Sequence, residues 1–131
     1  MDENKEVRKE FQEVIVEIIK NNGKENEFDL EVGNEFIKLE DEILMDLVIE
    51  RVRENQLAVA HTKKVNYDII RDPEIVFDIG KEPWLPVSYE MSGIEYKKDM
   101  ENGLELNEIL SGWKINLEDC KFTDKTEGLV H

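Results

Sequence analysis

The order of apolar and polar residues predicts a helix near the start of the chain. Between Glu6 and Lys20 the apolar residues recur at spacings of one, three and four, which places them on one face of a helix. These residues are Val7, Phe11, Val14, Ile15, Ile18 and Ile19. Gly23 follows the last turn and can take the left-handed conformation that ends a helix, and Asp2 is the predicted cap at its start. An amphipathic helix with one buried face is therefore expected.

Alternation of apolar and polar residues replaces this spacing in the middle of the chain. A period of two, broken by Gly, Asn and charged clusters, is typical of half-buried β-strands. Segment 43–52 also fits a helical face, but a strand is favoured because a hairpin follows it. The predicted strands are 27–32, 35–40, 43–52, 56–62, 74–80, 84–91 and 93–98. Short turns at 33–34, 54–55 and Asp72-Pro73 predict an antiparallel meander.

Helical spacing returns between Glu101 and Asp119 and predicts a second, shorter helix that is interrupted near Gly112. Residues 121–131 carry few apolar side chains and are expected to fray. We expect residues 1–131 to form one domain, because the length suits a single core and no repeat or linker divides the chain. The predicted class is α+β: a long N-terminal helix on a mostly antiparallel meander of about five to six strands, with a short C-terminal helix.

Charge narrows the choice of partners. Apolar residues make up 40% of the chain, and 32 acidic residues against 17 basic ones give a formal net charge of −15. A surface this negative repels phosphate backbones and anionic membranes, so a basic protein surface is the favoured partner, rather than nucleic acid or a membrane. We expect a monomer or a homodimer. The single cysteine, Cys120, and the lack of a leader or a long apolar run predict a cytoplasmic protein without disulfides.

Two sets of polar residues could carry metal chemistry. His61, Asp72, Asp78 and Glu95 offer nitrogen and oxygen ligands. The order of Asp78 followed by Glu95-x-Lys97 is similar to metal-dependent nucleases of the PD-(D/E)xK type, in which the acids hold Mg²⁺ and the lysine aids the attacking water. A metal-dependent hydrolase is therefore the alternative function.

The strand pattern argues against both sets. In a strand from Glu74 to Ile79, Glu74 and Asp78 point away from the core, while Ile75, Phe77 and Ile79 point into it. His61 ends the apolar run "LAVAH", where a histidine usually bonds to the backbone. No phosphate-binding loop or Cys/His cluster is present. We expect a non-enzymatic protein without catalytic residues, cofactors or metal.

Two aromatic residues have two interpretations. Trp84 and Tyr89 lie in "PWLPVSY", where Pro83 and Pro86 confine the strand to an edge, an end or a bulge. They either pack in the core or form a docking surface, since Trp and Tyr dominate interface energies. The acids expected to contact a partner beside them are Glu31, Glu35, Glu40, Asp41, Glu42, Asp46 and Glu50.

Residues 57–89 resemble a family of small uncharacterised proteins encoded in bacteria, phages and other mobile elements. The matching positions are His61, Asn66, Asp68, Asp72-Pro73-Glu74, "IVFDI" and "WLPVSY". The resemblance implies the α+β meander and a mobile-element origin, and no settled activity. Together with the charge it leads to the hypothesis of an anti-CRISPR-like inhibitor: a nucleic-acid mimic that blocks a basic surface of a host defence or replication complex.

Overall fold

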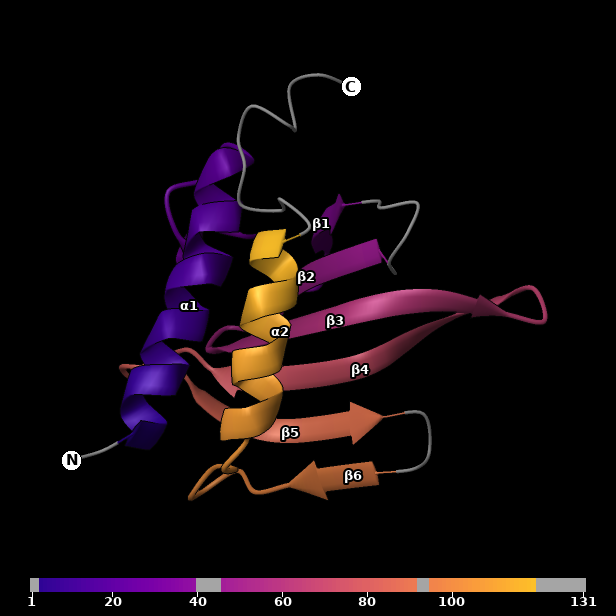
Figure 1. The fold of residues 1–131 in the computed structure, drawn as a ribbon. Helices are drawn as coiled ribbons and strands as arrows, with labels where there is room; N and C mark the ends of the chain where they lie inside the picture. The colour runs from indigo at the N-terminus through magenta and orange to yellow at the C-terminus, as the bar shows by residue number, and fades with distance from the viewer. Residues whose placement is uncertain (1–2, 40–45, 92–94, 120–131) are drawn as a thin grey trace.

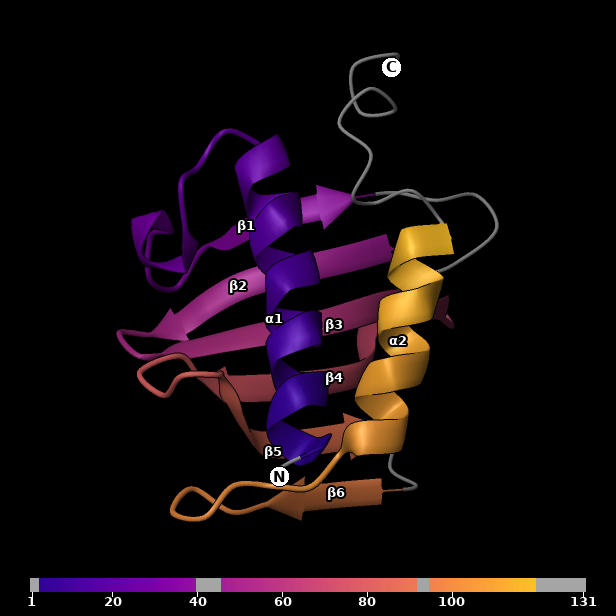
Figure 2. The same cartoon turned by 60° about the vertical axis from the view of Figure 1, so that its left-hand side comes forward.

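The computed structural model describes residues 3–39, 46–91 and 95–119, which form two α-helices, one short 3-10 helix and six strands. In chain order the elements are α1 (Glu3–Asn21), η1 (Glu27–Asp29), β1 (Glu35–Leu39), β2 (Asp46–Arg53), β3 (Gln56–Val65), β4 (Asp68–Asp78), β5 (Leu85–Met91), β6 (Glu95–Lys98) and α2 (Asn107–Asp119). The strands form one antiparallel sheet in chain order, and both α-helices lie side by side across one face (Figures 1 and 2). The predicted α+β fold with an antiparallel meander is confirmed.

The helix-covered face of the sheet carries the hydrophobic core. Alternate strand residues point to it, as Ile75 and Phe77 of β4 do, and the predicted stripe of α1 packs against them. The ring of Phe11 lies 5.6 Å from that of Phe77 and 5.6 Å from that of Trp113, so one aromatic group joins α1, β4 and α2. No helix within the described ranges is long and apolar enough to cross a membrane.

Polar residues of α1 hold the loop between β4 and β5. The guanidinium group of Arg8 donates to the carbonyl oxygens of Pro83 and Trp84, at 2.9 Å each. Gln12 accepts a hydrogen bond from the backbone N–H of Trp84 at 2.8 Å. Trp84 therefore enters the core at a fixed point, directly before β5.

Segment 27–32 does not form the predicted strand. The side chain of Asn26 accepts from the backbone N–H of Phe28 at 2.8 Å, and the carboxylate of Asp29 accepts from that of Asn26 at 3.2 Å. This capping box favours a 3-10 turn over a strand, because short polar side chains compete with the sheet for backbone groups. The prediction of a hairpin around residues 33–34 is wrong, and β1 pairs with β2 instead.

The other predicted turns differ in outcome. Glu54-Asn55 joins β2 to β3 as expected. Asp72-Pro73, however, lies inside β4, where these two residues stand opposite the single His61 of β3. Such a bulge accommodates proline, which has no N–H to donate to a neighbouring strand. The prediction of a turn there is wrong, and β4 starts earlier, at Asp68.

Of the two glycines predicted to end or interrupt a helix, only one does so. Gly23, with a φ of 98°, follows α1 and donates to the carbonyl oxygen of Lys20, as its αL prediction requires. Gly112 does not interrupt α2, so that prediction is wrong, because Leu110, Trp113 and Leu117 pack the helix onto the core on both sides of it. The cap at Asp2, the tail 121–131 and Cys120 lie outside the described residues.

Two glycine substitutions are expected to change stability in opposite directions. Gly103 has a φ of 77°, and a Cβ there would lie 2.4 Å from Cγ of Leu85, so Gly103→Ala should lower the free energy of unfolding, by about 2 kcal/mol. Gly112 is exposed inside α2 with nothing within 4 Å, so Gly112→Ala should raise it by about 0.5–1 kcal/mol. Urea denaturation of both variants measures the difference, and a neutral Gly103→Ala would contradict the close packing.

Candidate protein-interaction face

The face of the sheet opposite α1 and α2 is covered by no helix of the described residues, and we call it the open face (Figures 1 and 2). The register of the strands assigns its central positions: Val48 and Glu50 of β2, Ala58, Ala60 and Thr62 of β3, Arg71, Glu74, Val76 and Asp78 of β4, Ser88 and Glu90 of β5, and Tyr96 and Lys98 of β6. Ala58, Ala60 and Thr62 are buried, although they do not belong to the core. The small side chains of β3 therefore form a floor between longer side chains of β2 and β4.

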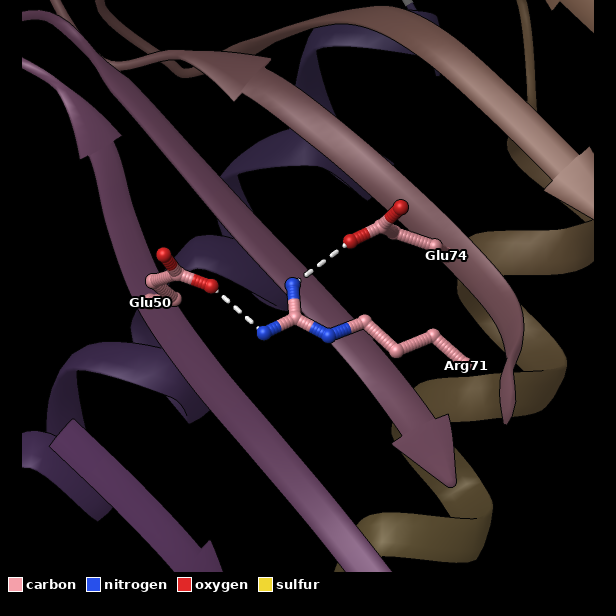
Figure 3. A network of polar contacts seen from close by, with 3 residues as sticks. All are labelled: Glu50, Arg71 and Glu74. Atoms are coloured by element: carbon pink, nitrogen blue, oxygen red, sulfur yellow. Dashed lines mark hydrogen bonds and ion pairs between the residues drawn. The ribbon is translucent and has the colours of Figure 1, made fainter. Parts of the chain in front are cut away.

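An arginine crosses this floor and joins the flanking strands. One guanidinium nitrogen of Arg71 donates to Glu50 at 2.5 Å, and another donates to Glu74 at 2.8 Å. Figure 3 shows the guanidinium group between the two carboxylates, over β3, which lies between β2 and β4 in the sheet. The side chains of Arg71 and Glu50 are 26% and 16% exposed, so the pair is shielded in part from solvent and fixes both carboxylates in place.

The bulge in β4 makes this network possible. Arg71 and Glu74 are three residues apart, and in a regular strand they would point to opposite faces. Two residues, Asp72 and Pro73, stand opposite His61, so the alternation changes phase and both charged side chains reach the open face. The signal in the sequence is a proline inside an apolar-polar alternation, which is typical of a bulge as well as of a turn.

Carboxylates outnumber cations among the described side chains of the open face. The carboxylates of Glu50, Glu74, Asp78 and Glu90 stand against the cations of Arg53, Arg71 and Lys98. Glu90 is exposed and lies directly opposite Glu74 in the register of β4 and β5. Two like charges in that position repel each other, and Arg71 offsets the repulsion only for Glu74. The open face therefore keeps exposed negative charge.

The acids expected to contact a partner do not all lie on one face, and the structure describes only some of them. Glu50 belongs to the open face, whereas Glu31 is exposed in the loop before β1. Glu35 and Asp46 are placed by register alone, opposite Glu50 and Thr62 respectively. Glu40, Asp41 and Glu42 lie outside the described residues. The sequence did not single out Arg71 or Glu90, and it placed Glu74 on the outer face without linking it to Glu50, because only the strand register brings these residues together.

Trp84 and Tyr89 do not lie on a surface. Their side chains are 0% and 1% exposed, and the ring of Trp84 lies 5.8 Å from that of Phe77 in the core. Pro86 lies in β5 next to the register shift between β4 and β5. Tyr89 stands opposite Ile75 and therefore lies on the helix side of the sheet. Of the two interpretations left open by the sequence, the structure shows core packing, and neither residue can reach a partner while the domain is folded.

His61 is buried, and it does not end its strand. It lies within β3, and its Nε2 accepts a hydrogen bond of 2.6 Å from the indole N–H of Trp113, a contact that the sequence did not predict. An indole nitrogen can only donate, so this bond requires an unprotonated Nε2 and hence a neutral imidazole. The pair fastens α2 to the sheet.

The two predicted metal-ligand sets are spread over the sheet. His61 faces the helices, whereas Asp78 pairs with Gln56 on the open face and accepts a hydrogen bond from the N–H of Gly80. In register, Asp78 pairs with Leu85 at the start of β5, and Glu95 pairs with Met91 at its end, about 20 Å away along the strand. Within the described residues no three His, Cys, Asp or Glu side chains come close enough to hold a metal ion. Asp72 lies in the bulge of β4, and Lys97 of β6 stands opposite Tyr89 of β5.

One carboxylate outside the open face, that of Asp99, has a lowered pKa. Asp99 accepts hydrogen bonds from the backbone N–H groups of Asn102 and Glu101, at 2.9 and 3.1 Å. The bond from Asn102 is the main cause that lowers the pKa of Asp99. A lowered pKa contributes stability above the ordinary carboxyl range, and that contribution is lost as the pH falls through the lowered value. Asp99 thereby fixes the turn that leads from β6 to α2.

A family model described as "Domain of unknown function (DUF6908)" matches residues 9–123 of the chain. The match covers α2, all the described strands and α1 from its seventh residue onward. Neither a curated protein nor a solved structure is found to match the chain.

We expect Arg71→Met to destabilise the fold more than an ordinary surface ion pair would. The variant keeps an apolar stem and leaves Glu50 and Glu74 facing each other, which should cost about 1–2 kcal/mol after allowance for partial exposure. Lys114→Met is the control, because it breaks the more exposed pair with Glu118. Urea denaturation at low and at high salt measures both. Equal losses in the two variants would contradict a structural role of the network.

A second prediction concerns the bond between His61 and Trp113. His61→Leu leaves the buried indole N–H without its acceptor and should cost about 1–3 kcal/mol at pH 8. The difference from the wild type should shrink at acidic pH, because a protonated imidazole can no longer accept the bond. Urea denaturation across pH measures this difference. A difference that does not change with pH would contradict the assigned bond.

Proposed function

We propose that this chain, which belongs to the DUF6908 family, is a non-enzymatic binding domain whose open face docks on a basic surface of another protein. One observation carries the proposal: the open face, which no described helix covers, holds the carboxylates of Glu50 and Glu74 in place through Arg71 above a floor of small residues. No helix of the described residues would have to move for a partner to approach this face (Figures 1 and 2).

The fixed carboxylates favour recognition over general solubility. Arg71 holds Glu50 and Glu74 in one arrangement in the free protein, so little conformational entropy is lost when a partner binds. Glu90 is exposed beside them and available to an incoming cation. A surface that served solubility alone would not need the ion-pair network.

The net charge supports the same partner. A chain with a formal charge of −15 attracts basic proteins over several ångströms and repels acidic ones. This long-range attraction raises the association rate, and the fixed groups of the open face then determine the register of the complex. Net charge and local geometry thus select one chemical class of partner.

The more specific form of the proposal concerns origin and target. We propose an inhibitor of mobile-element origin that acts in the cytoplasm and occupies the nucleic-acid-binding surface of a host defence or replication complex. The resemblance of residues 57–89 to small mobile-element proteins supports the origin. The excess of carboxylates supports the target, since a surface that binds phosphates also attracts carboxylates.

The test compares two charge reversals of equal size. Glu90→Lys changes the open face and places a lysine opposite Glu74, so the fold should not be destabilised. Glu17→Lys changes an exposed position of α1 on the other side of the molecule. The tagged full chain is used to retain proteins from cells of the organism that encodes it, at low and high salt, and the retained partner is then purified. Its affinity should fall about three- to tenfold for Glu90→Lys and stay unchanged for Glu17→Lys.

Two results would contradict the proposal. Retention of no basic protein at low salt would remove its electrostatic basis. An equal loss of affinity in both variants would show that net charge matters and the open face does not.

A further inference from the structure

The hairpin of β3 and β4 extends beyond the rest of the sheet. β2 pairs with β3 only as far as Thr62, and β5 pairs with β4 only from Glu74. Residues 63–70, which we call the arm, therefore pair only with one another among the described strands. Figure 1 shows the arm reaching past the ends of β2 and β5. Among the described residues the arm is thus a two-stranded ribbon that no third strand flanks.

The turn at the tip of the arm contains a strained tyrosine. Asn66 and Tyr67 both have positive φ values, 52° and 75°, as the central residues of a type I′ turn do. Asparagine and glycine adopt such a conformation easily, but an aromatic residue does so at a cost. Tyr67 gains no packing in return, because its side chain is 104% exposed. Folding of the free chain therefore does not explain a tyrosine at this position.

The arm also differs from the body in charge. Residues 63–70 contain two lysines and one aspartate, whereas the whole chain carries −15. The exposed side chains described on it include Tyr67 and Ile70, the latter 37% exposed. A nearly neutral protrusion with an aromatic tip makes contact through buried apolar area rather than through charge, and tyrosine is among the residues that dominate such contacts.

We infer that the arm is the anchoring contact of the complex, with Tyr67 inserted into a shallow apolar pocket of the basic protein partner. This inference rests on the proposed function and adds a second surface to it. The face of a tyrosine ring attracts cations, so arginine or lysine side chains of a basic partner suit the rim of such a pocket. Nucleic acid and a second copy of the chain are both disfavoured as occupants, because the acidic body repels them.

The arm and the open face can reach the same partner. Glu74 and Glu90 stand in the row of Ala60, and the arm ends after Val65, about 17 Å further along β3. A standard interface of about 800 Å² on each partner spans such a distance. One protein can therefore contact the carboxylates and Tyr67 together.

The first experiment replaces Tyr67 with the residue that the turn prefers. Tyr67→Gly should leave the melting temperature unchanged or raise it slightly, while the affinity for the purified partner falls at least about tenfold. Ile115→Ala is the matched control, because Ile115 is an exposed apolar residue of α2, 54% exposed, and its loss should not change the affinity. A marked fall in melting temperature for Tyr67→Gly would overturn the inference, since the tyrosine would then serve the fold.

The second experiment places the photo-cross-linker p-benzoylphenylalanine at position 67 of the full chain, and at position 115 as the control. We expect an adduct from position 67 with the same basic protein that the tagged chain retains, identified by mass spectrometry. An adduct with nucleic acid, an adduct with a second copy, or no adduct would each overturn the inference. If Glu90→Lys weakens binding and Tyr67→Gly does not, the arm inference fails while the proposed function stands; if neither weakens it, both fail.

Discussion

The bulge at Asp72-Pro73 is the constraint on which both faces of the sheet depend. β4 must bury Ile75, Phe77 and Ile79 under the helices, and it also contains a proline that cannot donate to a neighbouring strand. The bulge satisfies both demands, because it adds one residue opposite His61 and reverses the alternation before it. On the open face the change of phase brings Arg71 beside Glu74. On the helix side it leaves His61 in register with the core, where Trp113 bonds to it.

The sequence predicts the fold well where packing and local preference agree. Packing and local preference agree in the stripe of α1, in the alternation of β3 to β5 and in the turn at residues 54–55. It fails where a local rule and tertiary packing conflict. The capping box of Asn26 and Asp29 overrides an alternating pattern in segment 27–32, and sheet pairing overrides the turn preference of Asp72-Pro73. Gly112 weakens a helix locally, but the side chains of α2 are held by the core on both sides of it.

The candidate site is less predictable than the fold, for a physical reason. Net charge favours the proposed class of partner but carries no information on which carboxylates share a face. Glu50 was among the expected contact residues, whereas Arg71 and Glu74 meet it only through pairing across three strands, one of them shifted by a bulge. Trp84 shows an ambiguity of another kind, because a residue type common at interfaces is also one that fills a core, and only the structure decides between the two.

Two features that lower the stability of the fold lie on the same half of the molecule, and folding alone explains neither. Glu74 and Glu90 are opposed in register although they carry the same charge, and Tyr67 holds a backbone conformation that glycine would adopt without strain. Sequence choices that conflict with local stability are concentrated where a protein has another use for the residue. The helix side carries one conflict of its own, since the buried indole nitrogen of Trp84 has no hydrogen-bond partner among the described residues, while the stripe of α1 and the aromatic group around Phe11 satisfy packing and pattern together. That conflict lies inside the core, whereas Glu90 and Tyr67 are exposed, so the half of the sheet that runs from Glu90 to the arm is the part of the surface that supports the proposed binding role.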